Sequence, residues 1–102
     1  MIKVYGSKMC GNTKNFRYNL DYYKIEYEFI DINESLKNLK EFLKFRDTSP
    51  KYNRIKEQGG IGIPTIINQD GSLTLRWREF LEDLGYKIQN RSEECIDNDE
   101  NC

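Results

Sequence analysis

Residues 61–67 read Ile-Gly-Ile-Pro-Thr-Ile-Ile, a β-branched run with turn residues on both sides. The composition predicts a buried strand, but Pro64 has no N–H to donate to a neighbouring strand. Two interpretations stay open. Pro64 begins the strand, or the Ile63–Pro64 peptide bond is cis and interrupts the pairing, which leaves the backbone of Ile63 available to a ligand.

The segment that follows predicts a hairpin and then a helix. Asn68-Gln69-Asp70-Gly71 is a turn sequence, and the returning strand runs from Ser72 to about Arg76. A last helix is predicted to end at Gly85, and its inward face consists of Trp77, Phe80, Leu81 and Leu84.

Upstream of residue 61 the chain alternates between strand and helix patterns. Strands are predicted at residues 2–5 and 25–30, and helices at residues 11–23 and 34–45. The apolar faces of these helices are Phe16, Leu20 and Tyr23, and Leu36, Leu39, Phe42 and Leu43. A short third helix is predicted to begin at Pro50, with Ser49 as its N-cap, and to stop at Gly59-Gly60. The order is therefore βαβα(α)ββα. It predicts an α/β fold with a four-stranded mixed sheet, in which two parallel strands are joined by a right-handed crossover and the last two form an antiparallel hairpin, with helices on both faces.

Length and composition limit the class of protein. The chain has 102 residues, enough for one domain, and 16 Lys and Arg against 17 Asp and Glu give a net charge of −1. This balance argues against a nucleic-acid binder, and no apolar run is long enough to span a membrane. The sequence has no His, which removes the commonest acid–base group and metal ligand. We expect a cytoplasmic monomer with no metal site.

Charge divides the chain into two parts. Residues 1–89 carry fifteen basic and twelve acidic side chains, a net of +3, whereas residues 90–102 carry one basic and five acidic ones, a net of −4. We therefore predict a folded domain at 1–89 and an acidic, disordered tail at 90–102. Two of the three cysteines, Cys95 and Cys102, lie in this tail. They are interpreted as incidental thiols, and the alternative is that one reaches back to Cys10 and acts as a resolving thiol.

Cys10 is the candidate nucleophile. It falls where a predicted strand ends and a helix begins, so the N–H groups and the positive end of the helix dipole favour its thiolate. Lys8 and Lys14 add positive charge nearby, and the hydroxyl of Thr13 is expected to donate a hydrogen bond to the sulfur. The plain alternative is that Cys10 is a small, buried and inert loop residue.

The predicted order of strands and helices, together with two short motifs, resembles the glutaredoxin family, which has the thioredoxin fold. The motifs are Cys10-Gly11-Asn12-Thr13 at the first helix and Gly62-Ile63-Pro64-Thr65 before the hairpin. The resemblance covers roughly residues 2–88. Within the family, the chain is similar to a bacterial glutaredoxin-related branch. Thr13 stands where dithiol members have a second cysteine. Arg76-Trp77-Arg78-Glu79 stands in place of the family's glutathione-binding Gly-Gly and acidic residues.

The resemblance implies a monothiol glutaredoxin-like thiol–disulfide oxidoreductase. Its catalytic residues would be Cys10 and Thr13. Its substrate-binding residues would be Lys8, Ile63, Pro64 and Thr65. The substrate would be a disulfide-containing protein or a small-thiol substrate. No cofactor is expected, and the alternative is a low-molecular-weight thiol such as glutathione.

Three other functions are kept open. The Cys-Gly-x-Thr pattern is similar to monothiol glutaredoxins in which two subunits hold an iron–sulfur cluster through this cysteine and two small thiols. The same opening faintly resembles that of arsenate reductases, although Ile63 occupies the place of their anion-binding arginine. The chain can also be a catalytically inactive thioredoxin-fold binding module.

Overall fold

A computed structural model gives the structure of the protein and describes residues 1–91. Its sheet has four strands in the order β2-β1-β3-β4. The strands are β1 (Ile2–Gly6), β2 (Tyr27–Asp31), β3 (Thr65–Ile67) and β4 (Leu73–Thr74). β1 pairs with β2 in parallel, whereas β1 with β3 and β3 with β4 are antiparallel. The predicted mixed sheet is confirmed.

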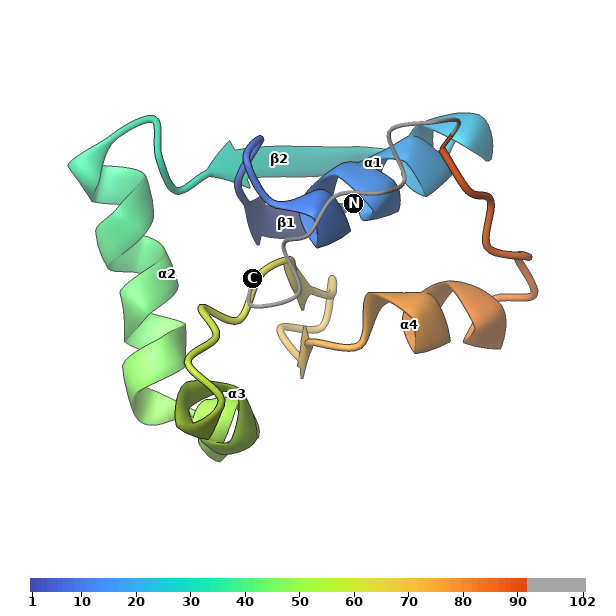
Figure 1. The fold of residues 1–102 in the computed structure, drawn as a ribbon. Helices are drawn as coiled ribbons and strands as arrows, with labels where there is room; N and C mark the ends of the chain where they lie inside the picture. Colours follow the sequence, from blue (N-terminus) through green and yellow to red (C-terminus); the bar gives the residue numbers. More distant parts are fainter. Residues whose placement is uncertain (92–102) are drawn as a thin grey trace.

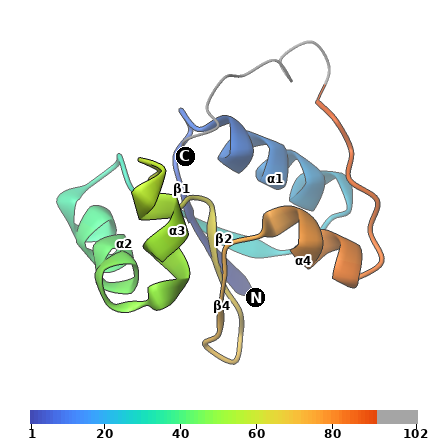
Figure 2. The same cartoon turned by 60° about the horizontal axis from the view of Figure 1, so that its bottom comes forward.

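Helices cover both faces of the sheet, as Figures 1 and 2 show. The helical segments are α1 (Gly11–Tyr22), α2 (Leu36–Thr48), the 3-10 helix η1 (Pro50–Tyr52), α3 (Asn53–Glu57) and α4 (Trp77–Asp83). In Figure 2, α1 and α4 lie on one side of the strands and α2 and α3 on the other. This arrangement is the thioredoxin-like fold that the sequence predicted.

The alternation of side chains along β1 explains the two layers. Val4 packs on the α1 and α4 side with Phe16, Leu20, Ile66, Trp77 and Leu81. Its neighbour Tyr5 points to the opposite face, where it packs with Ile30, Ile32, Phe42, Tyr52 and Ile63. Burying large side chains in two layers supplies the main stabilising free energy of the domain.

The hairpin strands are shorter than the sequence predicted. The run at 61–67 forms a ladder only over Thr65–Ile67, because the Ile63–Pro64 peptide bond is cis and Gly62 has a positive φ of 100°. The cis bond confirms one of the two interpretations of Pro64. The returning strand is limited to Leu73–Thr74. Helix α2, by contrast, extends three residues beyond the predicted end at 45 and stops at Thr48, before Pro50.

Two leucines that were predicted to face the core are exposed. Leu36 is 71% exposed and Leu84 is 57% exposed. Each lies at an end of its helix, Leu36 at the first residue of α2 and Leu84 at the C-cap of α4. The helical period places both leucines on the apolar face of their helix. Because each lies at the end of its helix, its side chain stays exposed to solvent.

Candidate functional site

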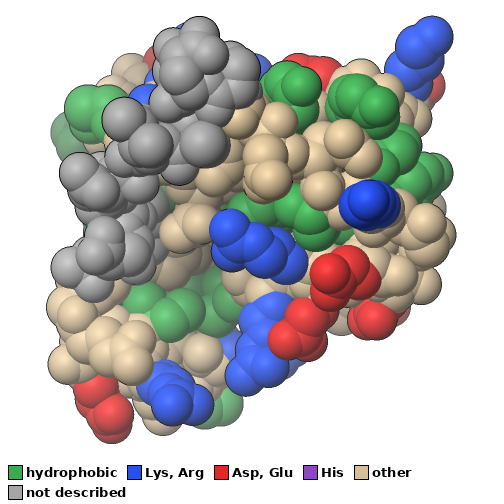
Figure 3. All heavy atoms as spheres, turned by 45° about the vertical axis from the view of Figure 1, so that its right-hand side comes forward, with side chains coloured by type: hydrophobic (Ala, Val, Ile, Leu, Met, Phe, Trp, Pro, Cys, Tyr) green, Lys and Arg blue, Asp and Glu red, His purple; other side chains and the backbone are tan. Residues whose placement is uncertain are grey.

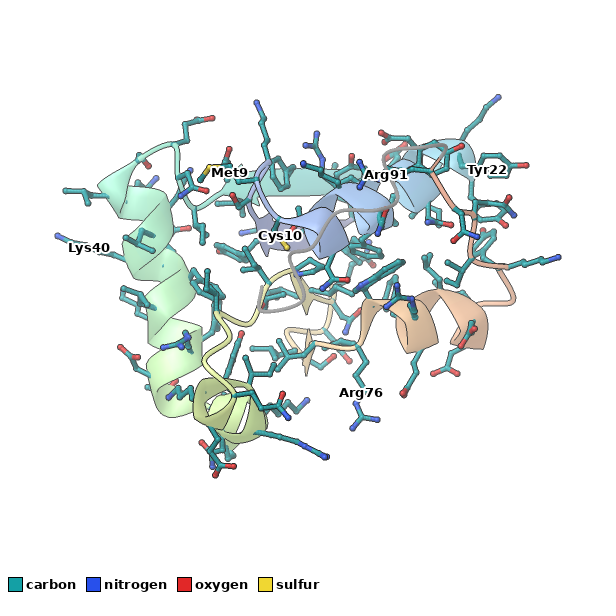
Figure 4. All side chains as sticks on the ribbon, viewed as in Figure 1. Met9, Cys10, Tyr22, Lys40, Arg76 and Arg91 are labelled. Atoms are coloured by element: carbon teal, nitrogen blue, oxygen red, sulfur yellow. The ribbon has the colours of Figure 1, made fainter. Side chains whose placement is uncertain are left out.

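Cys10 is the N-cap residue of α1. Its backbone is extended, with φ −95° and ψ 124°, and its sulfur accepts a hydrogen bond from the backbone N–H of Thr13 at 3.3 Å. The residue is only 4% exposed. Figure 4 shows its sulfur at the start of α1, facing the loop that leads into β3. The sulfur thus occupies the position where a helix N-terminus stabilises negative charge.

The loop before Cys10 is fixed by the side chain of Ser7. The Ser7 hydroxyl donates to the carboxamide oxygen of Asn33 and accepts from the N–H of Met9 at 3.1 Å. The N–H of Cys10 donates to the carbonyl of Ser7 at 3.1 Å. These bonds hold the backbone that enters α1, so the sulfur is placed by the loop and the helix together.

Thr13 contacts the sulfur through its backbone and not through its hydroxyl. The sequence predicted a hydrogen bond from the hydroxyl, but that oxygen accepts from the N–H of Ser7 at 3.4 Å. The side chain is fully buried against Gly6, where an added Cβ would lie 2.6 Å from Thr13 Cγ2. Packing against β1 therefore turns the hydroxyl away from Cys10, which a linear motif cannot reveal.

The loop before β3 brings Ile63 to Cys10. The Cys10 sulfur lies 3.9 Å from the carbonyl oxygen of Ile63. The ladder between β1 and β3 begins at Thr65, so the backbone of Ile63 lies outside it. The two motifs that the sequence singled out, more than 50 residues apart, therefore meet in space.

A buried hydrogen-bond chain supports this loop. The Thr65 hydroxyl donates to the carbonyl of Gly62 at 2.7 Å, and because it has one proton, the Tyr52 hydroxyl is the donor in its 2.8 Å contact with Thr65. Burial raises the pKa of Tyr52, which keeps this phenol protonated. The Thr65 side chain therefore faces the core and supports the loop, whereas the sequence placed Thr65 among the substrate-binding residues.

Arg46 ties the end of α2 to the same loop. Its Nε donates to the carbonyl of Ile61 at 2.7 Å, and its Nη2 donates to the carbonyl of Gly60 at 2.9 Å. From sequence alone, Arg46-Asp47 at the end of a predicted helix indicates a capping or surface pair, with Arg46 binding a ligand carboxylate as the alternative. The structure gives it a third role, which only the tertiary fold could reveal: it holds the backbone that precedes Ile63.

We expect Arg46→Ala to lower the free energy of unfolding by about 1–2 kcal/mol, because two charge-assisted hydrogen bonds to backbone carbonyls are lost. Arg54→Ala, on the exposed surface of α3, is the matched control and should change stability by less than about 0.5 kcal/mol. Urea unfolding of both variants measures the difference. Equal stabilities would show that Arg46 does not hold the loop.

A cavity of about 360 Å³ lies next to Cys10. Its lining includes Asn12 from α1, Ile63 and Pro64 from the loop, and Arg76 and Arg78 at the start of α4. Cys10 is not among the lining residues, but Ile63, whose carbonyl oxygen lies 3.9 Å from the Cys10 sulfur, is one of them. The lining thus combines apolar surface from Ile63, Pro64 and Trp77 with the side chains of Arg76 and Arg78. On the face drawn in Figure 3, basic side chains lie beside hydrophobic and acidic ones.

The remaining residues that the sequence predicted lie at different distances from the cavity. Trp77 is 5% exposed and its ring centroid lies 5.8 Å from that of Phe16, so its predicted place in the core is confirmed, and it also lines the cavity. Lys8 is exposed in the loop before Cys10 and is not a lining residue. Arg76 extends outward, in an exposed ion pair with Glu79 at 3.1 Å (Figure 4).

Cys10 is disulfide-bonded in the structure. The predicted acidic tail lies outside the described residues, apart from residues 90 and 91, and so do the alternative roles given to Cys95 and Cys102.

Within residues 1–91, no three His, Cys, Asp or Glu side chains are placed to hold a metal ion. None of the described helices is long and apolar enough to cross a membrane.

Comparison with known proteins relates the chain to others in sequence and in fold. No protein-family model matches the sequence. An uncharacterized protein of Haemophilus influenzae is 32% identical over 72 residues, which cover 71% of this chain and 84% of that protein. A crystal structure described as a possible glutathione S-transferase from Rhodopseudomonas palustris is similar with a TM-score of 0.51 and 15% identity. The likeness covers 91% of this chain but only 42% of that one, and it extends to the fold alone.

Proposed function

We propose that this chain, which belongs to the same protein family as the uncharacterized Haemophilus influenzae protein, is a glutaredoxin-like thiol–disulfide oxidoreductase with Cys10 as its nucleophile. The observation that carries the proposal is the position of the Cys10 sulfur. It caps the N-terminus of a twelve-residue helix and lies 3.9 Å from a loop carbonyl at the edge of a cavity. An inert, buried cysteine requires none of these features.

The reaction is an exchange of disulfides. The Cys10 thiolate attacks one sulfur of a disulfide R–S–S–R′, the S–S bond breaks, and R′S⁻ leaves with the electron pair and takes up a proton. The product is a mixed disulfide between Cys10 and R. A second thiolate then attacks the Cys10 sulfur or the R sulfur and completes the exchange. No oxidant or reductant other than these thiols and disulfides is needed.

Local geometry supports the thiolate in this reaction. The Thr13 N–H points at the sulfur from 3.3 Å, and the N-terminal end of α1 carries a partial positive charge. Burial at 4% exposure opposes this effect, because desolvation disfavours a charged sulfur. We expect the helix terminus to dominate, as it does at other capping cysteines that begin a helix.

The charge of the cavity supports an anionic substrate. Arg76 and Arg78 line it, and because Arg76 is paired with Glu79, the single acidic lining residue, the lining keeps one net positive charge, with the Arg78 guanidinium 4.5 Å from the Trp77 ring. Ile63, Pro64 and Trp77 supply apolar surface for the rest of the molecule. A small thiol or a peptide with carboxylates near its sulfur fits this combination.

The pH dependence of alkylation tests the nucleophile. In reduced protein with Cys95→Ser and Cys102→Ser, we expect the iodoacetamide reaction of Cys10 to reach half its maximal rate at least about one pH unit below the ~8.5 of an ordinary thiol. The same variant unfolded in urea is the control and should show the ordinary midpoint. A folded midpoint at or above the unfolded one would contradict the proposed function.

A further inference from the structure

A second hollow, called here the β4 groove, adjoins the cavity beside Cys10. It has a volume of about 490 Å³, and its lining comes from η1, β4, α4 and the residues next to them. Leu75, Arg76 and Glu79 line both hollows. The exposed Arg76–Glu79 ion pair therefore stands at their common border, beside the start of α4 (Figure 2). A substrate that extends past this ion pair enters the β4 groove.

The backbone of β4 is directed into the groove at alternate residues. β4 is the last strand of the sheet, and its neighbour is β3. Lys51 Nζ donates to the carbonyl of Leu73 at 2.6 Å, so this carbonyl points away from β3. Because alternate residues of an antiparallel strand turn their backbone groups to the same side, those of Leu75 also point away from β3, whereas those of Thr74 face Ile66. An edge of this kind can pair with one more extended chain.

The lining of the β4 groove is apolar and carries no net charge. Leu73, Leu75 and Phe80 are half-buried, and Leu84 is 57% exposed. The cavity beside Cys10, by contrast, keeps one net positive charge. The two hollows therefore suit different parts of one ligand, a charged part near the reacting sulfur and an apolar part farther along. The charges that cancel in the groove are those of Lys51, Arg76, Glu79 and Asp83.

We infer that the substrate of Cys10 is an extended segment of a disulfide-bonded polypeptide, and that this segment continues into the β4 groove as an added strand beside β4. The inference rests on the proposed function and narrows its substrate from small thiols to polypeptides. The backbone of the segment pairs with Leu75, and an apolar side chain contacts Leu84. In the reaction the Cys10 sulfur bonds to the sulfur of the segment, and the other half of the disulfide leaves as a thiolate with the electron pair.

The test compares peptide disulfides of two lengths as reactants of the reduced Cys95→Ser, Cys102→Ser protein. The long peptide has about six residues on each side of its cysteine, alternately valine and serine, and each arm spans about 20 Å when extended. The short peptide has a single residue on each side. Acid quenching and mass analysis give the rate of adduct formation on Cys10. We expect the long peptide to react at least about tenfold faster, because it gains backbone hydrogen bonds and apolar contact in the groove.

Two changes should remove this advantage. A long peptide with N-methylated backbone amides cannot donate to the edge of β4, and it should react within about a factor of two of the short peptide. In Leu84→Ser, the ratio of the long to the short rate should fall at least about threefold, because apolar contact is lost. Leu36→Ser is the matched control, an exposed leucine at the start of α2, and should keep the ratio within about a factor of two.

The contrary outcomes separate the inference from the proposed function. Equal rates for the long and short peptides, or for the methylated and unmethylated ones, would overturn the inference while Cys10 still acts as a nucleophile. A dimer in sedimentation that Leu84→Ser abolishes would overturn it as well, because a second copy of the chain would then occupy the edge. If no peptide forms an adduct with Cys10, the proposed function itself fails.

Discussion

Replacing Cys10 with serine should reduce the rate of disulfide exchange at least about 10³-fold, because a hydroxyl does not form a covalent intermediate with sulfur. The reduction of a model disulfide by a small thiol, followed in the presence of the variant, measures this rate. Serine is a favourable N-cap residue, so its oxygen can accept the Thr13 N–H that the sulfur accepts now. We therefore expect the fold to be retained, with a change of less than about 1 kcal/mol in unfolding free energy.

Cys95→Ser is the matched control for this variant, because it removes a thiol that the account does not use. It should keep the wild-type exchange rate within about a factor of two. A Cys10→Ser protein that folds and still catalyses exchange at the wild-type rate would show that the chemistry lies elsewhere.

The second large effect is expected from Thr13→Cys in a chain that also carries Cys95→Ser and Cys102→Ser. The Thr13 backbone nitrogen lies 3.3 Å from the Cys10 sulfur, and a cysteine side chain rotated away from Gly6 brings its thiol within reach of a disulfide. The parent Cys95→Ser, Cys102→Ser protein should stall as a mixed disulfide on Cys10. The protein with Thr13→Cys added should release the bound thiol unaided, with a rate gain of at least about 100-fold, since the introduced thiol is intramolecular.

Mass analysis of the trapped species follows this step and should find an internal disulfide between Cys10 and the introduced thiol. The cost in stability should be modest, at about 1 kcal/mol, because the hydroxyl accepts only one long hydrogen bond of 3.4 Å from Ser7. Thr13→Ser is the control and should leave the parent stalled. Equal stalling of Thr13→Cys and Thr13→Ser would contradict the placement of residue 13 beside the reacting sulfur.

The sequence predicted those parts of the fold that depend on local pattern. The helical period identified Phe16 and Leu20 as core residues, and both are fully buried. The ends of elements were less predictable. Leu36 continues the apolar period of α2, but it lies beyond the sheet and is exposed. Period alone does not indicate where a helix leaves the core.

The sequence predicted the candidate site as two motifs, at residues 10–13 and 62–65. The βαβ order places the two motifs close together at one end of the sheet. The support around them was not predictable. Arg46 contacts a loop that lies 14 residues later, and Tyr52 donates to Thr65, 13 residues later. Such contacts depend on how α2 and η1 pack against the sheet, which no local pattern records. The orientation of the Thr13 hydroxyl depends in the same way on Gly6 of β1.

The central claim is that Cys10 forms a covalent mixed disulfide with its substrate. The most direct measurement uses the reduced Cys95→Ser, Cys102→Ser protein, in which Cys10 is the single thiol. The protein is mixed with a disulfide-bonded acidic peptide, quenched with acid and analysed by intact and peptide mass. The account predicts one peptide per chain, attached to Cys10 and removed by an added thiol. A folded protein that stays unmodified while the same protein in urea is modified would contradict it.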